Sequence, residues 1–277
     1  MTRLSFALVV KGMNLRLKQT LARKKVFLFD LDGTLYMGKK LIPGALALIQ
    51  GLRTQKKKIF FFTNNSSRSV EDYIQKLKGF GFSVHKDEIV MSTHTLISFL
   101  KNKNWKNIFL LGTPSMQKML ANEKIKHTKN NPKAVVVGFD KTLTYEKILV
   151  ACRLIEKKIP LVVTHPDLFC PTDEGPEPDC GAIAKLLELS SGRDRHSTLG
   201  KPHPSMIQEV IKRSGRKKSE MILIGDRLST DVKMGREAGI ETILVLSGET
   251  KRQHLRAMHS LKPTFVVPSV KELRMIG

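Results

Sequence analysis

Residues 25–34 read Lys-Val-Phe-Leu-Phe-Asp-Leu-Asp-Gly-Thr, and this stretch decides the fold. Its first half is a short, apolar, aromatic-rich run of the kind that forms a buried parallel strand. Asp30 and Asp32 follow at its end, and the two-residue period of a strand sends both carboxylates to the same side. Ligands bind at the carboxyl ends of strands in open α/β sheets, and two like charges there need a cation; a hard divalent ion such as Mg²⁺ suits carboxylate oxygens. The alternative is a helix-initiating Asp followed by an Asp-Gly turn.

Strand-like and helix-like runs alternate along the rest of the chain, which predicts an α/β fold with parallel sheets. Strands are expected at 26–29, 58–63, 88–91, 107–111, 134–139, 161–164, 221–224 and 242–246. Helices are expected at 44–53, 70–78, 144–157, 204–213 and 230–238. Two polar stretches rich in Pro and Gly, 170–181 and 190–203, are expected to be long irregular loops.

The length of 277 residues exceeds the usual size of one domain, so we expect two. The predicted architecture is a Rossmann-like parallel sheet core from residues 25–92 and 196–277. An α/β unit of residues 93–195 is inserted between these parts.

The first 24 residues form a basic extension that we expect to be disordered or dispensable. Residues 1–25 contain seven basic groups and no acid. The apolar run 4–10 is too short to span a membrane, and no convincing signal-peptide cleavage site follows it. A transit peptide or a helix at a membrane surface would share this composition, and Met13 offers an alternative start.

Composition is typical of a soluble globular protein, with 41% hydrophobic and 26% charged residues. The three cysteines form no C-x-x-C pair, which disfavours a disulfide framework or a thiolate zinc site and favours the cytoplasm. The net charge of +23 fits a lysine-rich solvated surface, steering of an anionic substrate or nucleic-acid binding. The basic residues are dispersed and lack interleaved aromatics, so a nucleic-acid partner is not expected.

A second apolar run, 59–62, ends in Thr63 and Asn64. Ser69 and Asp72 then have the spacing of a capped helix start. Hydroxyl, amide and backbone N–H groups beside a helix start can bind an anion, although turn chemistry alone would also explain them.

Two later segments carry charge at comparable places. Lys201 stands between Gly and Pro at a loop-to-helix junction, where a cation can balance phosphate, or simply be a surface lysine. A buried strand at 221–224 runs into Gly225 and Asp226, and Asp226 can reach a cation from a neighbouring strand end. Asp231 suits a place behind the metal ligands or at a helix N-cap.

Together these segments supply a nucleophile, further carboxylates, phosphate-binding groups, a cation and a metal ligand. This combination is what phosphoryl transfer through an aspartyl-phosphate requires.

The same segments resemble the haloacid dehalogenase superfamily, and more narrowly its NagD/4-nitrophenylphosphatase branch, which has a cap domain between its second and third motifs. The resemblance extends from residue 25 to residue 277. Its segments are 62–66 (Phe-Thr-Asn-Asn-Ser), 137–145 (Val-Gly-Phe-Asp-Lys-Thr-Leu-Thr-Tyr), 200–202 (Gly-Lys-Pro), 225–228 (Gly-Asp-Arg-Leu) and 263–269 (Pro-Thr-Phe-Val-Val-Pro-Ser).

The resemblance implies Asp30 as the nucleophile and Asp32 as the general acid/base. It implies Mg²⁺ held by Asp30, the Asp32 carbonyl and Asp226, and phosphate bound by Thr63, Asn64 and Lys201.

Two departures lie in the expected cap. Many relatives carry Asn where this chain has His165, and residues 178–181 read Pro-Asp-Cys-Gly in place of Pro-Gly before a small residue and Gly. We therefore expect His165, Asp167 and Asp179 to set substrate choice, with the chemistry left to the core.

The function expected is a Mg²⁺-dependent phosphatase acting on a small phosphorylated metabolite in the cytoplasm, without a membrane and with a homodimer formed through the cap. A phosphotransferase or phosphomutase would use the same residues. A dehalogenase would need neither Asp32 nor Asp226, and a receiver-type signalling domain would need neither Asp-x-Asp nor the insertion. The non-enzymatic alternative is a basic nucleic-acid-binding protein that retains the fold.

Overall fold

The structure is a computed structural model that describes residues 15–172, 174–257 and 261–273. The chain divides into two compact units. Unit 1 comprises residues up to 63, 74–90 and those from 207 onward, and unit 2 comprises 64–73 and 91–206. None of the described helices is long and apolar enough to cross a membrane.

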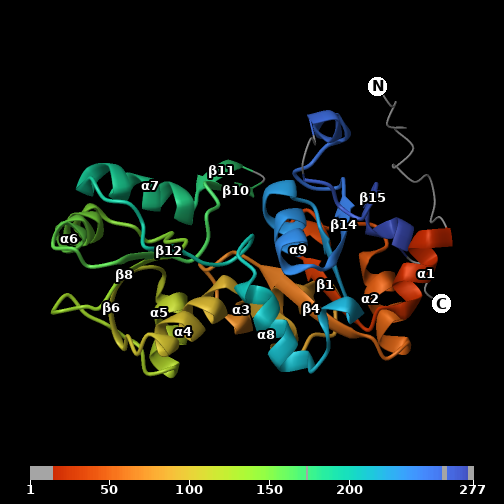
Figure 1. The fold of residues 1–277 in the computed structure, drawn as a ribbon, viewed down its shortest axis with the longest axis horizontal. Helices are drawn as coiled ribbons and strands as arrows, with labels where there is room; N and C mark the ends of the chain where they lie inside the picture. The colour runs from red at the N-terminus through yellow and green to blue at the C-terminus, as the bar shows by residue number, and fades with distance from the viewer. Residues whose placement is uncertain (1–14, 173, 258–260, 274–277) are drawn as a thin grey trace. The chain divides into compact units, whose positions relative to one another are not determined.

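Unit 1 is built on a six-stranded sheet with β1 at its centre (Figure 1). The strands lie in the order β15 (Phe265–Val267), β14 (Glu241–Val245), β13 (Met221–Gly225), β1 (Val26–Asp30), β4 (Lys58–Thr63) and β5 (Ile89–Met91). The neighbours from β15 to β4 pair in parallel. Along the chain, the strands run outward from β1 through β4 to β5. The chain then returns to the other side of β1 and runs outward in the opposite direction through β13, β14 and β15. Parallel sheets bind ligands at such a reversal, beyond the carboxyl ends of the strands.

Helices flank this sheet, as its apolar strands require. In Figure 1, α2 (Ala45–Thr54) and α9 (Lys233–Ala238) lie beside its strands. The remaining helices of unit 1 are α1 (Leu15–Arg23), most of α8 (Ser205–Ser214), the second half of α3 (Val70–Gly79) and the short turns η1 (Lys86–Glu88), η2 (Lys218–Glu220), η3 (Leu228–Val232), η4 (Arg252–Ala257) and η5 (Val270–Leu273). A small antiparallel pair, β2 (Tyr36–Met37) and β3 (Lys40–Leu41), follows β1.

Helix α1 corrects part of the expectation for the N-terminal extension. Residues 1–24 were expected to be disordered or dispensable; within them, 15–23 form a helix whose Leu17 and Leu21 are buried. Lys24 is also buried and donates from Nζ to the Ser219 carbonyl at 2.7 Å. The helix is amphipathic, and the burial of its leucines against unit 1 outweighs the tendency of its charged residues to stay in solvent. Residues 1–14 lie outside the described part of the chain.

Unit 2 contains a second parallel sheet whose two faces are covered by different helices (Figure 1). Its order is β12 (Ser197–Thr198), β9 (Leu161–Val163), β8 (Val135–Val137), β6 (Asn107–Leu111) and β7 (Lys126–His127). Alternate residues of β6 point to opposite faces: Ile108 and Leu110 pack with α4 (Ser92–Asn102) and α5 (Pro114–Asn122). Phe109 and Leu111 pack with α6 (Tyr145–Glu156) and α7 (Cys180–Ser191). The period of two thus gives three layers.

The structure confirms the predicted α/β class and every predicted strand and helix, with shifts of a few residues at their ends. The helix expected from residue 230 starts with the π-helical turn η3 and becomes α-helical at Lys233.

The prediction of an irregular loop over 170–181 is wrong. Strands β10 (Phe169–Thr172) and β11 (Gly175–Pro178) pair antiparallel, and α7 begins at Cys180. The stretch 190–203 is mostly irregular, as expected, apart from the end of α7 and the two residues of β12. Helices α4, α5 and α7 were not predicted.

Candidate active site

Three buried carboxylates meet at the reversal in the strand order of unit 1. Asp30 ends β1, Asp226 directly follows β13, and Asp231 lies in η3. One oxygen from each lies within 4.8 Å of the others. Parallel pairing of β1 with β13 sets this proximity, since their carboxyl ends lie at one edge of the sheet.

The ionised form of Asp226 is destabilised by this arrangement. Burial raises its pKa well above the ordinary value, and the Asp30 and Asp231 carboxylates raise it further. The Glu249 amide donates to its Oδ2 at 2.6 Å and acts in the opposite direction. Its Oδ1 is buried and, among the described residues, has no hydrogen-bond partner. A group of like charges with one free buried oxygen is suited to a cation.

Two glycines allow the backbone to approach Asp226 closely. A Cβ at Gly33, where φ is +84°, would stand 2.6 Å from Asp226 Oδ2, and one at Gly248 would stand 1.9 Å from the same oxygen. Neither position can therefore carry a side chain without moving the carboxylate. The loop after β1 and the loop after β14 are both shaped around Asp226.

Asp32 is not part of the buried carboxylate group. Its carboxylate is 41% exposed and is held by two other side chains of unit 1. Tyr36 donates from its hydroxyl to Oδ2 at 3.1 Å, and Lys76 Nζ lies 3.6 Å from Oδ1.

The residues expected to bind phosphate fall in both units. Thr63 ends β4 in unit 1 and is buried, whereas Asn64 and Lys201 belong to unit 2. The Asn64 side chain clamps the backbone of Lys201: its Oδ1 accepts from Lys201 N–H at 2.7 Å, and its Nδ2 donates to the Lys201 carbonyl at 3.0 Å. The same Nδ2 donates to Asp167 Oδ2 at 3.1 Å. The structure therefore joins Asn64, Lys201 and Asp167 in one network.

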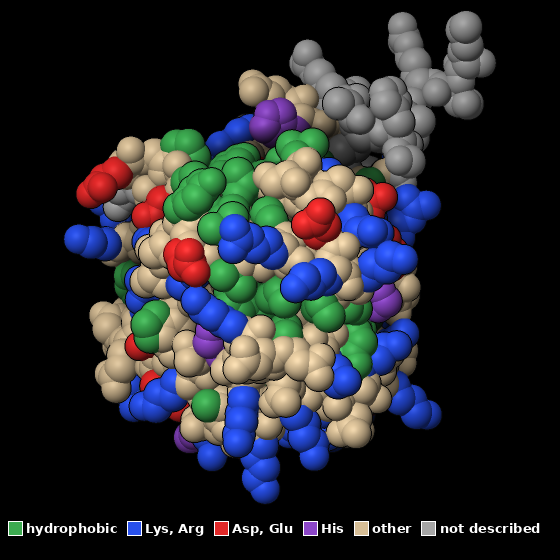
Figure 2. Space-filling view, turned by 90° about the vertical axis from the view of Figure 1, so that its left-hand side faces the viewer, with side chains coloured by type: hydrophobic (Ala, Val, Ile, Leu, Met, Phe, Trp, Pro, Cys, Tyr) green, Lys and Arg blue, Asp and Glu red, His purple; other side chains and the backbone are tan. Residues whose placement is uncertain are grey.

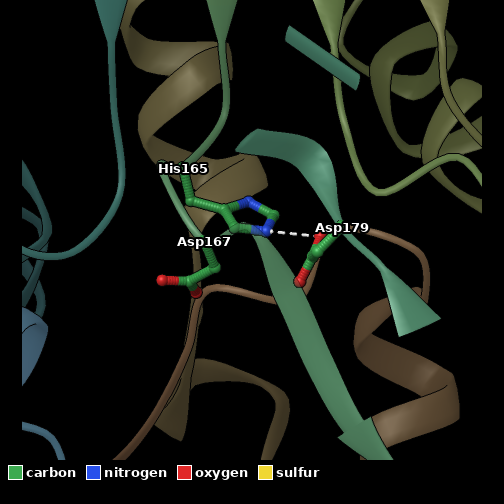
Figure 3. A group of neighbouring side chains, drawn as sticks. All are labelled: His165, Asp167 and Asp179. Carbon is green, nitrogen blue, oxygen red and sulfur yellow. Dashed lines mark hydrogen bonds and ion pairs between the residues drawn. The ribbon is translucent and has the colours of Figure 1, made fainter. Parts of the chain in front are cut away.

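The three residues expected to set substrate choice form a second group (Figure 3). The His165 imidazole points at Asp179, with Nε2 at 2.9 Å from Oδ1, and Asp167 lies to the side of this pair. The other ring nitrogen of His165 is 2.9 Å from the Thr164 hydroxyl, and Asp179 also caps α7 by accepting from Cys180 N–H. Burial raises the pKa of the neighbouring Cys180 thiol to about 12, so this cysteine is inert at neutral pH.

Sequence reasoning missed Tyr36, Lys76 and the loop that contains Gly248 and Glu249. Gly248 follows a predicted strand, so the glycine after that strand was a usable signal. No local pattern links Lys76 to Asp32, because the contact joins segments more than forty residues apart.

Comparison with known proteins places the chain in a family. Residues 27–126 match the haloacid dehalogenase-like hydrolase family, and residues 198–273 match a second, HAD-hydrolase-like profile. The 5′-nucleotidase YutF of Bacillus subtilis is 30% identical over 249 residues, which are 90% of this chain and 96% of that protein.

Solved structures agree. The 4-nitrophenylphosphatase of Thermotoga maritima is 41% identical with a TM-score of 0.88, covering 92% of this chain and 98% of that one. NagD of E. coli K-12 is 27% identical with a TM-score of 0.83, covering 90% and 98% respectively. The chain belongs to the haloacid dehalogenase-like hydrolases, in the NagD/4-nitrophenylphosphatase branch.

Proposed function

We propose that this protein is a Mg²⁺-dependent phosphatase that hydrolyses small phosphate monoesters through an aspartyl-phosphate on Asp30. The chain is a phosphoric monoester hydrolase. The observation that carries the finer proposal is the buried group of Asp30, Asp226 and Asp231 at the strand ends. Such a group supplies both a nucleophile and a cation site.

The donors fit Mg²⁺. All three are carboxylates, one buried oxygen of Asp226 lacks a partner among the described residues, and neither thiolate nor imidazole joins them. Asp30, Asp226 and the Asp32 carbonyl would hold the ion, with Asp231 beside Asp226. When bound, Mg²⁺ neutralises charge on the carboxylates and on the phosphoryl oxygens.

Asp30 attacks phosphorus in line, forming a new P–O bond while the bond to the alcohol oxygen breaks. Asp32 in its protonated form gives its proton to that departing oxygen. Asp32, now a carboxylate, takes a proton from water as the water oxygen attacks phosphorus and Asp30 leaves. The sum is ester plus water giving alcohol plus phosphate, with both aspartates restored.

In this proposal Thr63, Asn64 and Lys201 bind the phosphoryl group, and the segment 93–195 acts as a cap that sets substrate choice. The clamp on its backbone fixes the Lys201 residue. Among the three cap residues, His165 and Asp179 bind each other and are buried, whereas Asp167 is partly exposed. We propose that the pair shapes the loop and that Asp167 contacts the leaving group.

The substrate class is a small monoester. The relatives named above are a 5′-nucleotidase and a 4-nitrophenylphosphatase, so one fold serves different leaving groups. A panel of nucleotides, sugar phosphates and phospho-acids therefore has to be screened alongside 4-nitrophenyl phosphate.

Phosphate release over this panel tests the proposal. We expect activity with Mg²⁺, its loss in EDTA and its return on adding Mg²⁺. Asp30→Asn should fall by more than about a hundredfold while keeping its fold, since only the nucleophile is lost. Asp194→Asn, at an exposed site, is the matched control and should retain full activity. Full activity in EDTA, or an Asp30→Asn variant within about tenfold of wild type, would contradict the mechanism.

A further inference from the structure

We propose that Tyr36 and Lys76 are positioning residues that hold the Asp32 carboxylate in place for proton transfer to the leaving group. This inference rests on the proposed function, because it assumes that Asp32 is the proton donor. Neither residue touches the reacting atoms in this account. They act through Asp32.

Asp32 needs such support because of where it lies. Its neighbour Asp30 belongs to a fully paired central strand, whereas Asp32 is in the turn that follows and its side chain is 41% exposed. An exposed carboxylate that rotates freely spends little time in any one orientation. Proton transfer needs the donor within hydrogen-bond reach of the acceptor. Contacts therefore have to restrict the rotation of the Asp32 carboxylate, and they have to offset the entropy that it loses.

The two contacts hold different oxygens. The Tyr36 hydroxyl donates to Oδ2 at 3.1 Å, and Lys76 Nζ lies 3.6 Å from Oδ1. Two contacts on two oxygens fix the plane of the carboxylate, which a single contact would leave free to turn.

The supporting residues are themselves fixed. Tyr36 is fully buried, stacks on Phe80 with ring centroids 5.0 Å apart, and its carbonyl accepts from Gly33 N–H at 2.7 Å. Lys76 Nζ lies 4.0 Å from the centroid of the Tyr36 ring, a cation–π distance. Lys76 comes from α3, so an element distant in sequence holds the turn that carries Asp32.

This arrangement has a kinetic signature. An alkyl phosphate expels an alkoxide that must be protonated as the P–O bond breaks, whereas 4-nitrophenyl phosphate expels a stable phenolate that needs little help. The quantity kcat/KM covers the steps through loss of the alcohol and is blind to later hydrolysis of the intermediate. Loss of positioning therefore lowers kcat/KM for alkyl substrates and spares the aryl substrate.

The experiment compares Tyr36→Phe, Lys76→Met and Lys76→Arg with wild type on 4-nitrophenyl phosphate and on an alkyl phosphate from the screen. We expect kcat/KM for the alkyl substrate to fall about tenfold in Tyr36→Phe and Lys76→Met, with the aryl value within about threefold of wild type. Lys76→Arg keeps the charge and should recover part of the loss. Lys78→Met removes a lysine exposed on the same helix and is the matched control. Thermal unfolding of each variant separates these effects from loss of fold.

Asp32→Asn is run in parallel to separate two kinds of failure. If it lowers the alkyl value selectively but Tyr36→Phe and Lys76→Met affect both substrates equally or neither, the positioning role is wrong and the proton donor stands. If Asp32→Asn itself affects both substrates equally, the proposed proton donor is wrong. A rise in kcat/KM in Tyr36→Phe would show that the contacts hold Asp32 away from its working place, and would overturn the inference.

Discussion

At the scale of one residue, Asp226 is a buried carboxylate whose surroundings destabilise its charged form. Its pKa is raised by burial and by two neighbouring carboxylates, and one buried oxygen has no partner among the described residues. A bound cation would stabilise such a group. Glycine at 33 and 248 leaves room for the carboxylate, since a Cβ at either position would clash with it. The local sequence Ile-Gly-Asp therefore carries information about chemistry as well as about packing.

Glu188 shows the opposite case, a carboxylate stabilised by its partner. Arg195 holds it with a two-pronged ion pair that lowers the pKa of Glu188 to about 2. A lowered folded-state pKa contributes stability above the unfolded pKa, near 4.5, and that contribution is lost as pH falls toward 2. We expect Glu188→Gln to reduce the free energy of unfolding by about 1–2 kcal/mol at neutral pH, allowing for solvent screening. The difference from wild type should shrink below about pH 4.5 in denaturant titrations.

The control is Glu237→Gln. Its partner Lys233 lies at 4.0 Å, and both side chains are exposed, so the change should cost less than about 0.5 kcal/mol. A Glu188→Gln penalty that stays constant from pH 7 to pH 3 would assign the effect to packing instead.

The residues that could be predicted from the sequence are those that follow an apolar, strand-forming run. Asp30 and Asp226 follow apolar runs, so their meeting at one sheet edge was readable from the sequence, and the structure brings them together. Tyr36 and Lys76 were not readable, because an aromatic after Gly-Thr-Leu and a lysine in an amphipathic helix have ordinary structural uses. Their contact with Asp32 depends on how α3 packs.

At the scale of elements, α1 is the clearest departure from expectation. Its sequence has four basic residues between 15 and 24 and resembles a solvated tail. Leu17 and Leu21 nevertheless pack into unit 1, and Lys24 Nζ forms an ion pair with Glu241 at 2.6 Å.

We expect Leu17→Ala to lower the free energy of unfolding by about 2–4 kcal/mol, because it leaves a cavity under α1. Leu15→Ala is the matched control in the same helix. Leu15 is 71% exposed, so its loss should cost less than about 0.5 kcal/mol. Chemical denaturation measures both, and equal small effects would mean that α1 is dispensable, as the sequence suggested.

Two other unpredicted elements form against the preferences of their residues. The hairpin β10–β11 pairs Pro171 with Pro176 and ends at Pro178, and prolines normally argue against strands. It is an isolated two-stranded ribbon, where missing N–H donors can face solvent. Helix α4 begins Ser-Thr-His-Thr, a run of weak helix formers, and is held by packing against the sheet of unit 2.

At the scale of the whole molecule, two features lie outside the active site: the charge and the exposed apolar surface. Figure 2 shows hydrophobic side chains gathered on one face among lysines and arginines. The exposed large apolar residues of unit 2 are Tyr145, Leu168, Phe169, Leu186 and Leu189. A homodimer formed through the cap and a place in the cytoplasm stay predictions.

A net charge of +23 predicts attraction of a dianionic substrate. We expect kcat/KM to fall about three- to tenfold between about 0.02 M and 0.3 M salt, with kcat little changed, because screening acts on encounter. Stopped assays at fixed Mg²⁺ measure this, and filter binding to double-stranded DNA over the same salt series is the comparison. A steep salt slope for DNA with a flat kcat/KM would favour the nucleic-acid-binding alternative.

The insertion of most of unit 2 between β5 and β13 has a consequence for synthesis on the ribosome. Strand β1 emerges early, yet one of its two neighbours, β13, is not made until Met221–Gly225 have been translated. Throughout the intervening time the growing chain carries a hydrophobic strand with an open edge, a state prone to aggregation. Unit 2 can complete its own sheet during this delay, because all its strands precede residue 207. A nascent chain released before Met221 should therefore contain a folded insert attached to an unfinished core, and depend on chaperones to remain soluble.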